Sequence, residues 1–245
     1  MRVLLLVLLA LATVAPASAG APRRSGLVVW PARATVTAGS SAILHVANHT
    51  RATVALSVRA MGLALDLRGA PRLVRSSAGT ALVSVRAARV VVRPGAVGSI
   101  GVRVAPGRGL GSGDRPALVL LAARSAGGAG IGVQVRIGVP IEVRVPGVIR
   151  RRLVLGSLRV HGRRLELVVR NGGNVTERLA RGSVVVEVWR GVRRLATLQP
   201  RPRDLFPQAR GLAEFRLPAS LHGRARVVVR AFVPASGRRG FSVAL

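Results

Sequence analysis

The clearest pattern in the sequence is a strict alternation of apolar and other residues between residues 131 and 145. Every second residue of this run is a branched aliphatic, and none of the residues between them is a large hydrophobe. Side chains of a β-strand point alternately to its two faces, so the run predicts one long strand with a continuous apolar face. A helix could not sort these residues onto one side. The apolar face comprises Ile131, Val133, Val135, Ile137, Val139, Ile141, Val143 and Val145.

Shorter alternating segments recur along the chain and are separated by turn-forming residues such as Pro94-Gly95. Their regular spacing predicts a sandwich or barrel of short strands, without helices of ten or more residues in the mature chain. The strands predicted before the long one are Leu27–Trp30, Arg33–Thr37, Ala42–Asn48, Thr53–Ala60, Leu82–Arg86, Arg89–Val92, Ser99–Val104 and Ala117–Ala123. Those predicted after it are Leu153–Val160, Arg163–Arg170, Val184–Arg190, Arg193–Leu198, Ala213–Leu217, Arg224–Val233 and Gly240–Ala244.

The break at Val145-Pro146-Gly147 divides these strands into two groups. We therefore predict an all-β protein of two tandem immunoglobulin-like β-sandwiches, one over residues 27–146 and one over residues 147–245. Seven predicted strands in the second group match the number expected of an immunoglobulin-like sandwich. Residues 20–26 are predicted to be a short flexible leader in front of the first sandwich.

The first nineteen residues have the features of a secretory signal peptide. One charge at Arg2 precedes an apolar stretch, Val3–Val14, and the small-residue triplet Ala17-Ser18-Ala19 follows. The alternative is an uncleaved membrane anchor, but a spanning helix needs about 20 apolar residues. We predict cleavage after Ala19 and an exported protein, extracellular or associated with the cell envelope. The mature chain is expected to have no transmembrane helix.

Composition adds an unusual charge balance to this picture. The chain has 39 basic residues, all of them arginine, a net charge of +31 and no cysteine. The absence of cysteine excludes disulfides, thiolate metal sites and a lipoprotein anchor. A GC-rich genome would explain the choice of arginine over lysine, while the resulting field would attract anionic partners whatever its origin. We expect an anionic cell-envelope polymer or a surface protein as partner. Nucleic acid is not expected, because aromatic residues for base stacking are scarce.

The sequence contains no recognisable catalytic, metal-binding or cofactor-binding set. His45 and His49 have a spacing that would suit a metal only on a helix. The glycine-rich stretches Gly107–Gly113 and Gly127–Gly132 lack the nucleotide-binding pattern and are predicted to be two long hairpin loops. Glycosylation sequons begin at Asn48 and Asn174 and carry little weight, because such triplets often arise by chance. An enzyme would have to assemble scattered residues, and the reasonable candidates are Asp66, Asp114, His161 and His222.

Several segments of the first predicted domain carry a resemblance to known proteins. They are Arg33-Ala34-Thr35-Val36-Thr37-Ala38-Gly39, Leu44-His45-Val46-Ala47-Asn48, Val91-Val92-Arg93-Pro94-Gly95, Val102-Arg103-Val104-Ala105-Pro106, Gly113, Leu118–Ala122 and Gly138-Val139-Pro140-Ile141-Glu142-Val143. Over about 120 residues their order resembles the N-terminal immunoglobulin-like domain shared by periplasmic pilus chaperones and the WxL-interacting proteins of Gram-positive bacteria.

The resemblance implies two such domains in tandem and two kinds of partner. WxL-interacting proteins are thought to bind peptidoglycan and a partner surface protein, whereas pilus chaperones clamp the terminal carboxylate of a subunit with two cations. Arg33 could match the first of these cations and is our candidate anion contact. The stretch around Pro140-Ile141 offers no second cation. The chain also ends at Leu245 without the membrane helix and basic tail usual in WxL-interacting proteins.

Two functional hypotheses follow. The first is a non-enzymatic, exported bacterial protein that acts as a binding or structural module at the cell surface or cell wall. The alternative is a periplasmic-type chaperone that donates a β-strand to a surface or pilus subunit. Its strand-pairing edge would contain Ile131, Val133, Val135, Ile137, Val139, Ile141 and Val143. The alternative requires these apolar positions to be partly uncovered in the free protein.

Overall fold

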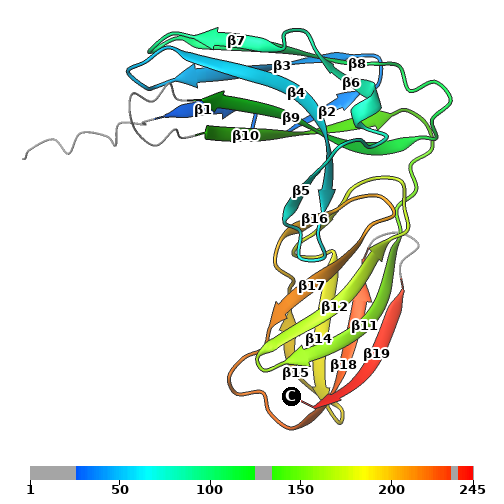
Figure 1. Cartoon of the computed structure of the whole chain (residues 1–245). Coiled ribbons are helices and arrows are strands. Elements are labelled where there is room, and N and C mark those ends of the chain that lie inside the picture. The colour runs from blue at the N-terminus through cyan, green and yellow to red at the C-terminus, as the bar shows by residue number, and fades with distance from the viewer. Residues whose placement is uncertain (1–25, 125–133, 233–236, 245) are drawn as a thin grey trace, which may run out of the picture.

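The computed structural model describes residues 26–124, 134–232 and 237–244, which form two β-sandwiches arranged as the arms of an L (Figure 1). The predicted all-β fold class is confirmed, since the described residues contain strands and one short 3-10 helix, η1 (Thr80–Leu82). The first sandwich contains β1 (Leu27–Trp30), β2 (Ala34–Thr37), β3 (Ser41–Asn48), β4 (Val54–Leu65), β5 (Pro71–Val74), β6 (Val83–Val85), β7 (Arg89–Val92), β8 (Val97–Val104), β9 (Gly113–Arg124) and β10 (Gln134–Val145).

Two sheets face each other in the first sandwich. One sheet has the order β1-β3-β8-β6, and the other has the order β2-β10-β9-β4-β5 with β7 also paired to β4. Alternate residues of each strand point inward, so the apolar sides of both sheets meet in one core. Leu44 and Ile100 from one sheet and Leu121 and Ile141 from the other are almost completely buried in it.

The N-terminal segment takes part in both sheets of this sandwich. β1 pairs antiparallel with β3, and after Pro31 the chain crosses over so that β2 pairs parallel with β10. The predicted segment Arg33–Thr37 is therefore a separate strand from Leu27–Trp30, as the sequence pattern indicated. The crossing places Arg33 between the two strands, at the end of the sandwich that faces the second domain.

The second sandwich has its own core. Its strands are β11 (Leu153–His161), β12 (Arg164–Asn171), β13 (Glu177–Leu179), β14 (Val184–Arg190), β15 (Arg193–Leu198), β16 (Arg203–Leu205), β17 (Arg210–Arg216), β18 (Arg224–Ala231) and β19 (Arg238–Ala244). They form sheets of order β11-β12-β17 and β15-β14-β18-β19, with a short pair, β13-β16, beside them. Leu165, Leu167, Val186 and Val227 are fully buried between the larger sheets.

Each sandwich is pinned by one buried asparagine at the end of a strand. Asn48 donates from its side-chain amide to the carbonyls of Ala52 and Val92, and Asn171 donates in the same way to Val175 and Leu205. Both asparagines have no exposed surface. In each case the side-chain oxygen also accepts an N–H two residues further along the chain. Asn48 is therefore closed to glycosylation in the folded protein.

The structure also corrects details of the sequence interpretation. Residues 107–112 do not close a hairpin, because the strands on either side, β8 and β9, belong to different sheets. The strands Pro71–Val74, Glu177–Leu179 and Arg203–Leu205 were not predicted, since each is short and has too few apolar residues to show an alternation. The predicted signal peptide, most of the leader and the Gly127–Gly132 loop lie outside the described residues.

The buried asparagines yield a test of how each sandwich is held. Replacing Asn171 by alanine leaves the carbonyls of Val175 and Leu205 without their donor. We expect the free energy of unfolding to fall by about 3 kcal/mol, because buried unpaired carbonyls are costly. Urea unfolding of N171A and N48A should give losses of similar size. The exposed Ser220→Ala variant is the control, and an equally small change in all three would contradict this role.

Candidate functional site

The long strand β10 has one edge that is only half used. Its other edge pairs with β9 along the whole strand, from Gln134 opposite Arg124 to Val145 opposite Gly113. On the outer side β2 pairs only with residues 141–144. From Val135 to Pro140, no described strand pairs with this outer edge. Pro140, which has no N–H to donate, is tolerated at such an edge position.

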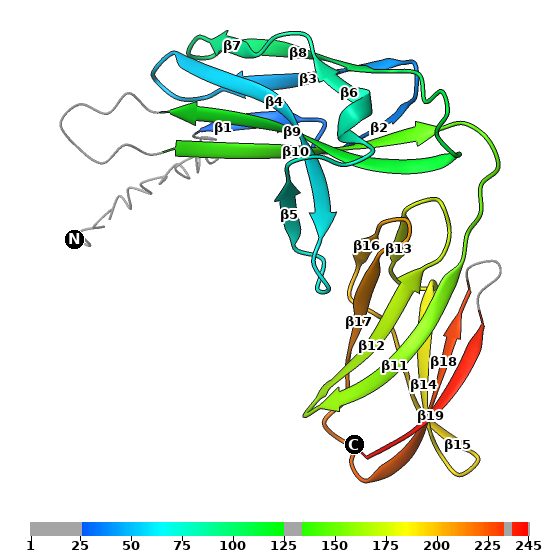
Figure 2. The ribbon, with the colours of Figure 1, turned by 45° about the vertical axis from the view of Figure 1, so that its right-hand side comes forward.

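The apolar side chains of β10 become steadily more exposed toward this free half. Val139, Ile141 and Val143 are buried in the core, Ile137 is half-buried, and Val135 is 44% exposed. All of them point to the same side, so the sandwich opens at the Val135 end. Ile131 and Val133, the first two residues of the predicted edge, lie outside the described residues. Figures 1 and 2 show the free half on the part of the first sandwich that points away from the second domain.

A hairpin from the first sandwich holds the second one. The tip between β4 and β5, residues 66–69, lies against β17, where the Leu67 carbonyl accepts the Leu212 N–H at 2.7 Å. Arg203 extends across the contact and donates to the carbonyls of Leu67 and Leu212 at 2.7 and 2.6 Å. The desolvation that accompanies this placement lowers the pKa of Arg203 below its ordinary value, and nearby carboxylates partly oppose that effect.

Arg68, at the tip of the same hairpin, spans two carboxylates of the second sandwich. Glu166 on β12 and Glu214 on β17 lie directly opposite each other. Like charges in such a cross-strand pair repel. The Arg68 guanidinium lies 3.3 Å from Glu166 and 3.8 Å from Glu214 and so compensates both.

Arg33, the predicted anion contact, also lies where the two sandwiches meet, a region that we call the joint. Its guanidinium is 2.7 Å from Glu142 on β10 and 2.6 Å from Asp204 on β16. Burial lowers the pKa of Arg33, but the two carboxylates raise it more, and the pKa lies above its ordinary value. An incoming carboxylate would have to compete with both partners. The anion-contact role of Arg33 stays a prediction.

Asp114 forms a further polar contact of the joint. Its side-chain oxygens accept two N–H groups of Arg144, at 2.7 and 3.0 Å, and the backbone N–H of Thr176 at 2.8 Å. Burial raises the pKa of Asp114, but these donors lower it more, so the pKa lies below its usual value. At neighbouring Glu142, burial and the charge of Asp114 raise the pKa above its usual value.

Backbone and apolar contacts complete the joint. The Asp114 N–H donates to the Asn174 carbonyl at 2.7 Å, and Gly113 approaches Asn174 too closely for any Cβ atom. Phe206, between β16 and β17, packs on Leu63, Leu118 and Leu120 of the first sandwich. These leucines lie on the face of their sheet opposite the main core, so that sheet is buried on both faces at the joint.

The candidates for an enzyme do not assemble. Asp66 accepts backbone N–H groups within its own turn, and Asp114 serves the joint. His161 and His222 are exposed in the second sandwich. Among the described residues, no hydrogen bond joins a histidine to an aspartate, and no group of metal-ligating side chains comes together. His45 instead stacks on Trp30, with ring centroids 5.4 Å apart.

Comparisons with solved structures support the architecture. A chain of a chaperone–tip adhesin complex of CFA/I fimbriae biogenesis resembles the protein with a TM-score of 0.52 at 11% identity, over 90% of this chain and 98% of that one. The class 5 fimbriae chaperone CfaA matches with a TM-score of 0.51 at 12% identity, over 89% and 98%. No protein-family model and no curated protein sequence matches.

These likenesses show the fold at low identity. The predicted resemblance to pilus chaperones is confirmed for the fold. The comparisons do not show the predicted resemblance to the WxL-interacting family. Among the described residues, no helix has the length and apolar character needed to cross a membrane.

The two acids on β9 and β10 should respond differently to substitution. Asp114→Asn is expected to lower the free energy of unfolding at pH 7 by about 2 kcal/mol, because it removes the charge that Arg144 and Thr176 stabilise. Glu142→Gln is expected to change it by less than about 1 kcal/mol, since neutralisation also removes a desolvation cost.

The pH dependence of stability tests the contribution of the Asp114 charge. A carboxyl with a lowered folded pKa stabilises above its unfolded pKa of about 3.9, and this stability is lost as the pH falls through the folded pKa. The gap between wild type and D114N should therefore close at low pH. Urea unfolding at pH 7 and pH 3 would measure it. A gap of constant size would show that the Asp114 charge is not responsible.

Proposed function

We propose that the protein is a non-enzymatic, exported chaperone-like protein that binds a segment of a surface or pilus subunit along the free half of β10. The observation that carries the proposal is the edge over residues 135–140, with which no described strand pairs, next to an exposed Val135 and a half-buried Ile137. An edge of this kind offers backbone hydrogen bonds to an added strand. The opening beside Val135 offers an apolar contact for its side chains.

The structural neighbours favour this function over a cell-wall binding module. Two matched structures are described as a fimbriae chaperone and as a chaperone–tip adhesin complex. By analogy, the partner of this chain would be a protein subunit rather than a polymer. The joint is compatible with the same function, because its described contacts lie away from the free half of β10, which is at the far end of the sandwich.

A photo-crosslinking residue at position 135 tests the proposal in cells that produce the exported protein. We expect crosslinks to segments of an envelope protein in which apolar residues alternate, because only an extended partner can lie along a strand edge. In a second experiment the probe is placed at position 137. The added substitution Val135→Asp, which puts an acidic side chain beside this edge, should then reduce crosslinking at least five-fold relative to the same probe without it.

The matched control is the same probe at Ile43. That side chain is 58% exposed and lies on β3, in the opposite sheet. It should give none of these crosslinks. The proposal is wrong if positions 43 and 135 capture the same proteins to the same extent.

The net charge of +31 favours a second candidate, an envelope-associated protein held by anionic polymers. Binding of that kind is electrostatic and is screened as the Debye length falls from about 10 Å at 0.1 M salt to about 3 Å at 1 M. Isolated envelopes should then retain the protein at low salt and release most of it at about 1 M salt. Retention that does not change with salt would favour the strand-edge interaction instead.

A further inference from the structure

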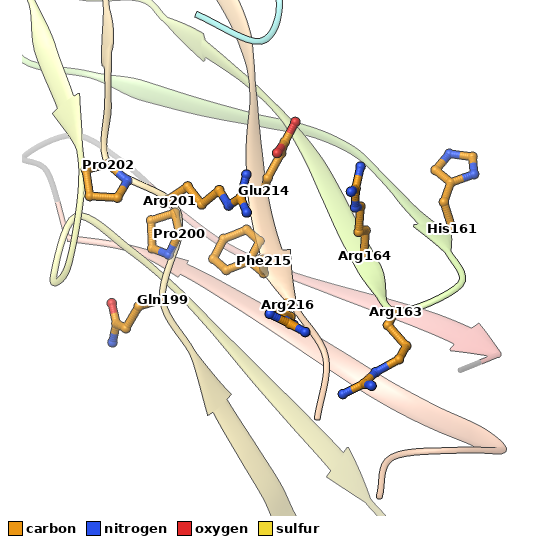
Figure 3. A pocket seen from close by; sticks show the side chains of 10 residues that line it. All are labelled: His161, Arg163, Arg164, Gln199, Pro200, Arg201, Pro202, Glu214, Phe215 and Arg216. Carbon is orange, nitrogen blue, oxygen red and sulfur yellow. The ribbon is translucent and has the colours of Figure 1, made fainter. Parts of the chain in front are cut away.

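A second surface feature lies on the second sandwich, apart from the β10 edge. An open hollow of about 550 Å³ is lined by residues of β11, β12 and β17 and of the segment between β15 and β16. This volume falls within the range of about 300–1,000 Å³ of small-molecule sites. Figure 3 shows four arginines, Arg163, Arg164, Arg201 and Arg216, distributed around Phe215. Glu214 is the one carboxylate among the described lining residues.

Two of these arginines form a like-charge pair. Arg164 on β12 lies directly opposite Arg216 on β17, and both side chains are exposed. Like charges at directly opposed strand positions destabilise a sheet. Within the described part of the chain, neither guanidinium lies within 4.0 Å of a carboxylate. The pair therefore lacks the compensation that Arg68 gives to the neighbouring glutamate pair.

The nearby acids are already engaged elsewhere. Glu166 and Glu214, the next residues along the same face of β12 and β17, both face Arg68 of the first sandwich. Arg201 uses its backbone N–H to bond the Glu214 carbonyl, and Arg163 donates to the Leu217 carbonyl. Four arginines thus line the hollow beside a single described carboxylate, Glu214, which already faces Arg68.

We propose that this hollow, lined by Arg163, Arg164, Arg201 and Arg216, binds a multivalent phosphate group. Guanidinium forks match phosphate oxygens in a two-pronged geometry. The four arginines come from three different segments and are spread around the hollow, so an anion with more than the two oxygens of a carboxylate can contact more of them. Phe215 is buried, so the hollow offers no exposed ring for base stacking and selects for the anion alone.

Calorimetric titration of the purified protein with inorganic pyrophosphate tests the site, with ionic strength held constant by sodium chloride. We expect saturable binding, and at least ten-fold weaker binding in R164Q/R216Q. The matched control is R170Q/R210Q, because Arg170 and Arg210 oppose each other on the same two strands but do not line the hollow. It removes the same charge and should bind within two-fold of wild type.

Folding of the key variant is checked separately. Without pyrophosphate, R164Q/R216Q should unfold at a temperature no lower than wild type, since a repulsive pair has been removed. The proposal is overturned if wild type does not bind pyrophosphate, or if the two double variants lose affinity equally, as generalised attraction to the net charge would produce.

Phosphate could come from a lipid headgroup or from a soluble compound. Co-sedimentation with vesicles that contain an anionic phospholipid separates these sources. Loss of vesicle binding in R164Q/R216Q alone would identify a headgroup, and unchanged vesicle binding would identify a soluble phosphate compound. Either result is compatible with pyrophosphate binding at the hollow.

Discussion

The antiparallel pairing of β9 with β10 is the interaction on which the rest of the structure depends. It runs from Gly113 opposite Val145 to Arg124 opposite Gln134. One face of the pair supplies the core of the first sandwich through residues such as Val119 and Val139. The other face supplies Leu118 and Leu120, which pack on Phe206 of the second sandwich. The free edge and the joint are therefore two parts of one ladder, and neither can shift register without the other.

The positions of the few acidic residues show how the joint is held together in a chain so rich in arginine. Six of the eight acids, Asp66, Asp114, Glu142, Glu166, Asp204 and Glu214, lie at or beside the contact between the sandwiches. The joint thus takes most of the negative charge available for pairing. One consequence is that the opposed arginines Arg164 and Arg216 at the hollow have no carboxylate within 4.0 Å among the described residues.

The local pattern of the sequence was enough to predict the fold class and all but three short strands, but the joint depends on distant pairs. Period-two alternation located the long strand and its end at Val145, because alternation reports burial on one face. The run from Ala117 to Leu121 is apolar at every position, which signals burial on both faces and could have indicated a contact beyond the core. The partners of Arg33 and Arg68 are about a hundred residues or more away in sequence, so no local spacing relates them.

The placement of the joint bears on how a partner strand could be accepted. Polar contacts of Arg33, Arg68 and Asp114, together with Phe206, hold the sandwiches at one end of β10. The exposed apolar residue Val135 and the stretch of edge with which no described strand pairs lie at the other end. A strand added there would extend an existing sheet and would not require the two domains to separate. The cost of binding would then come mainly from ordering the partner, because the edge that receives it is already formed.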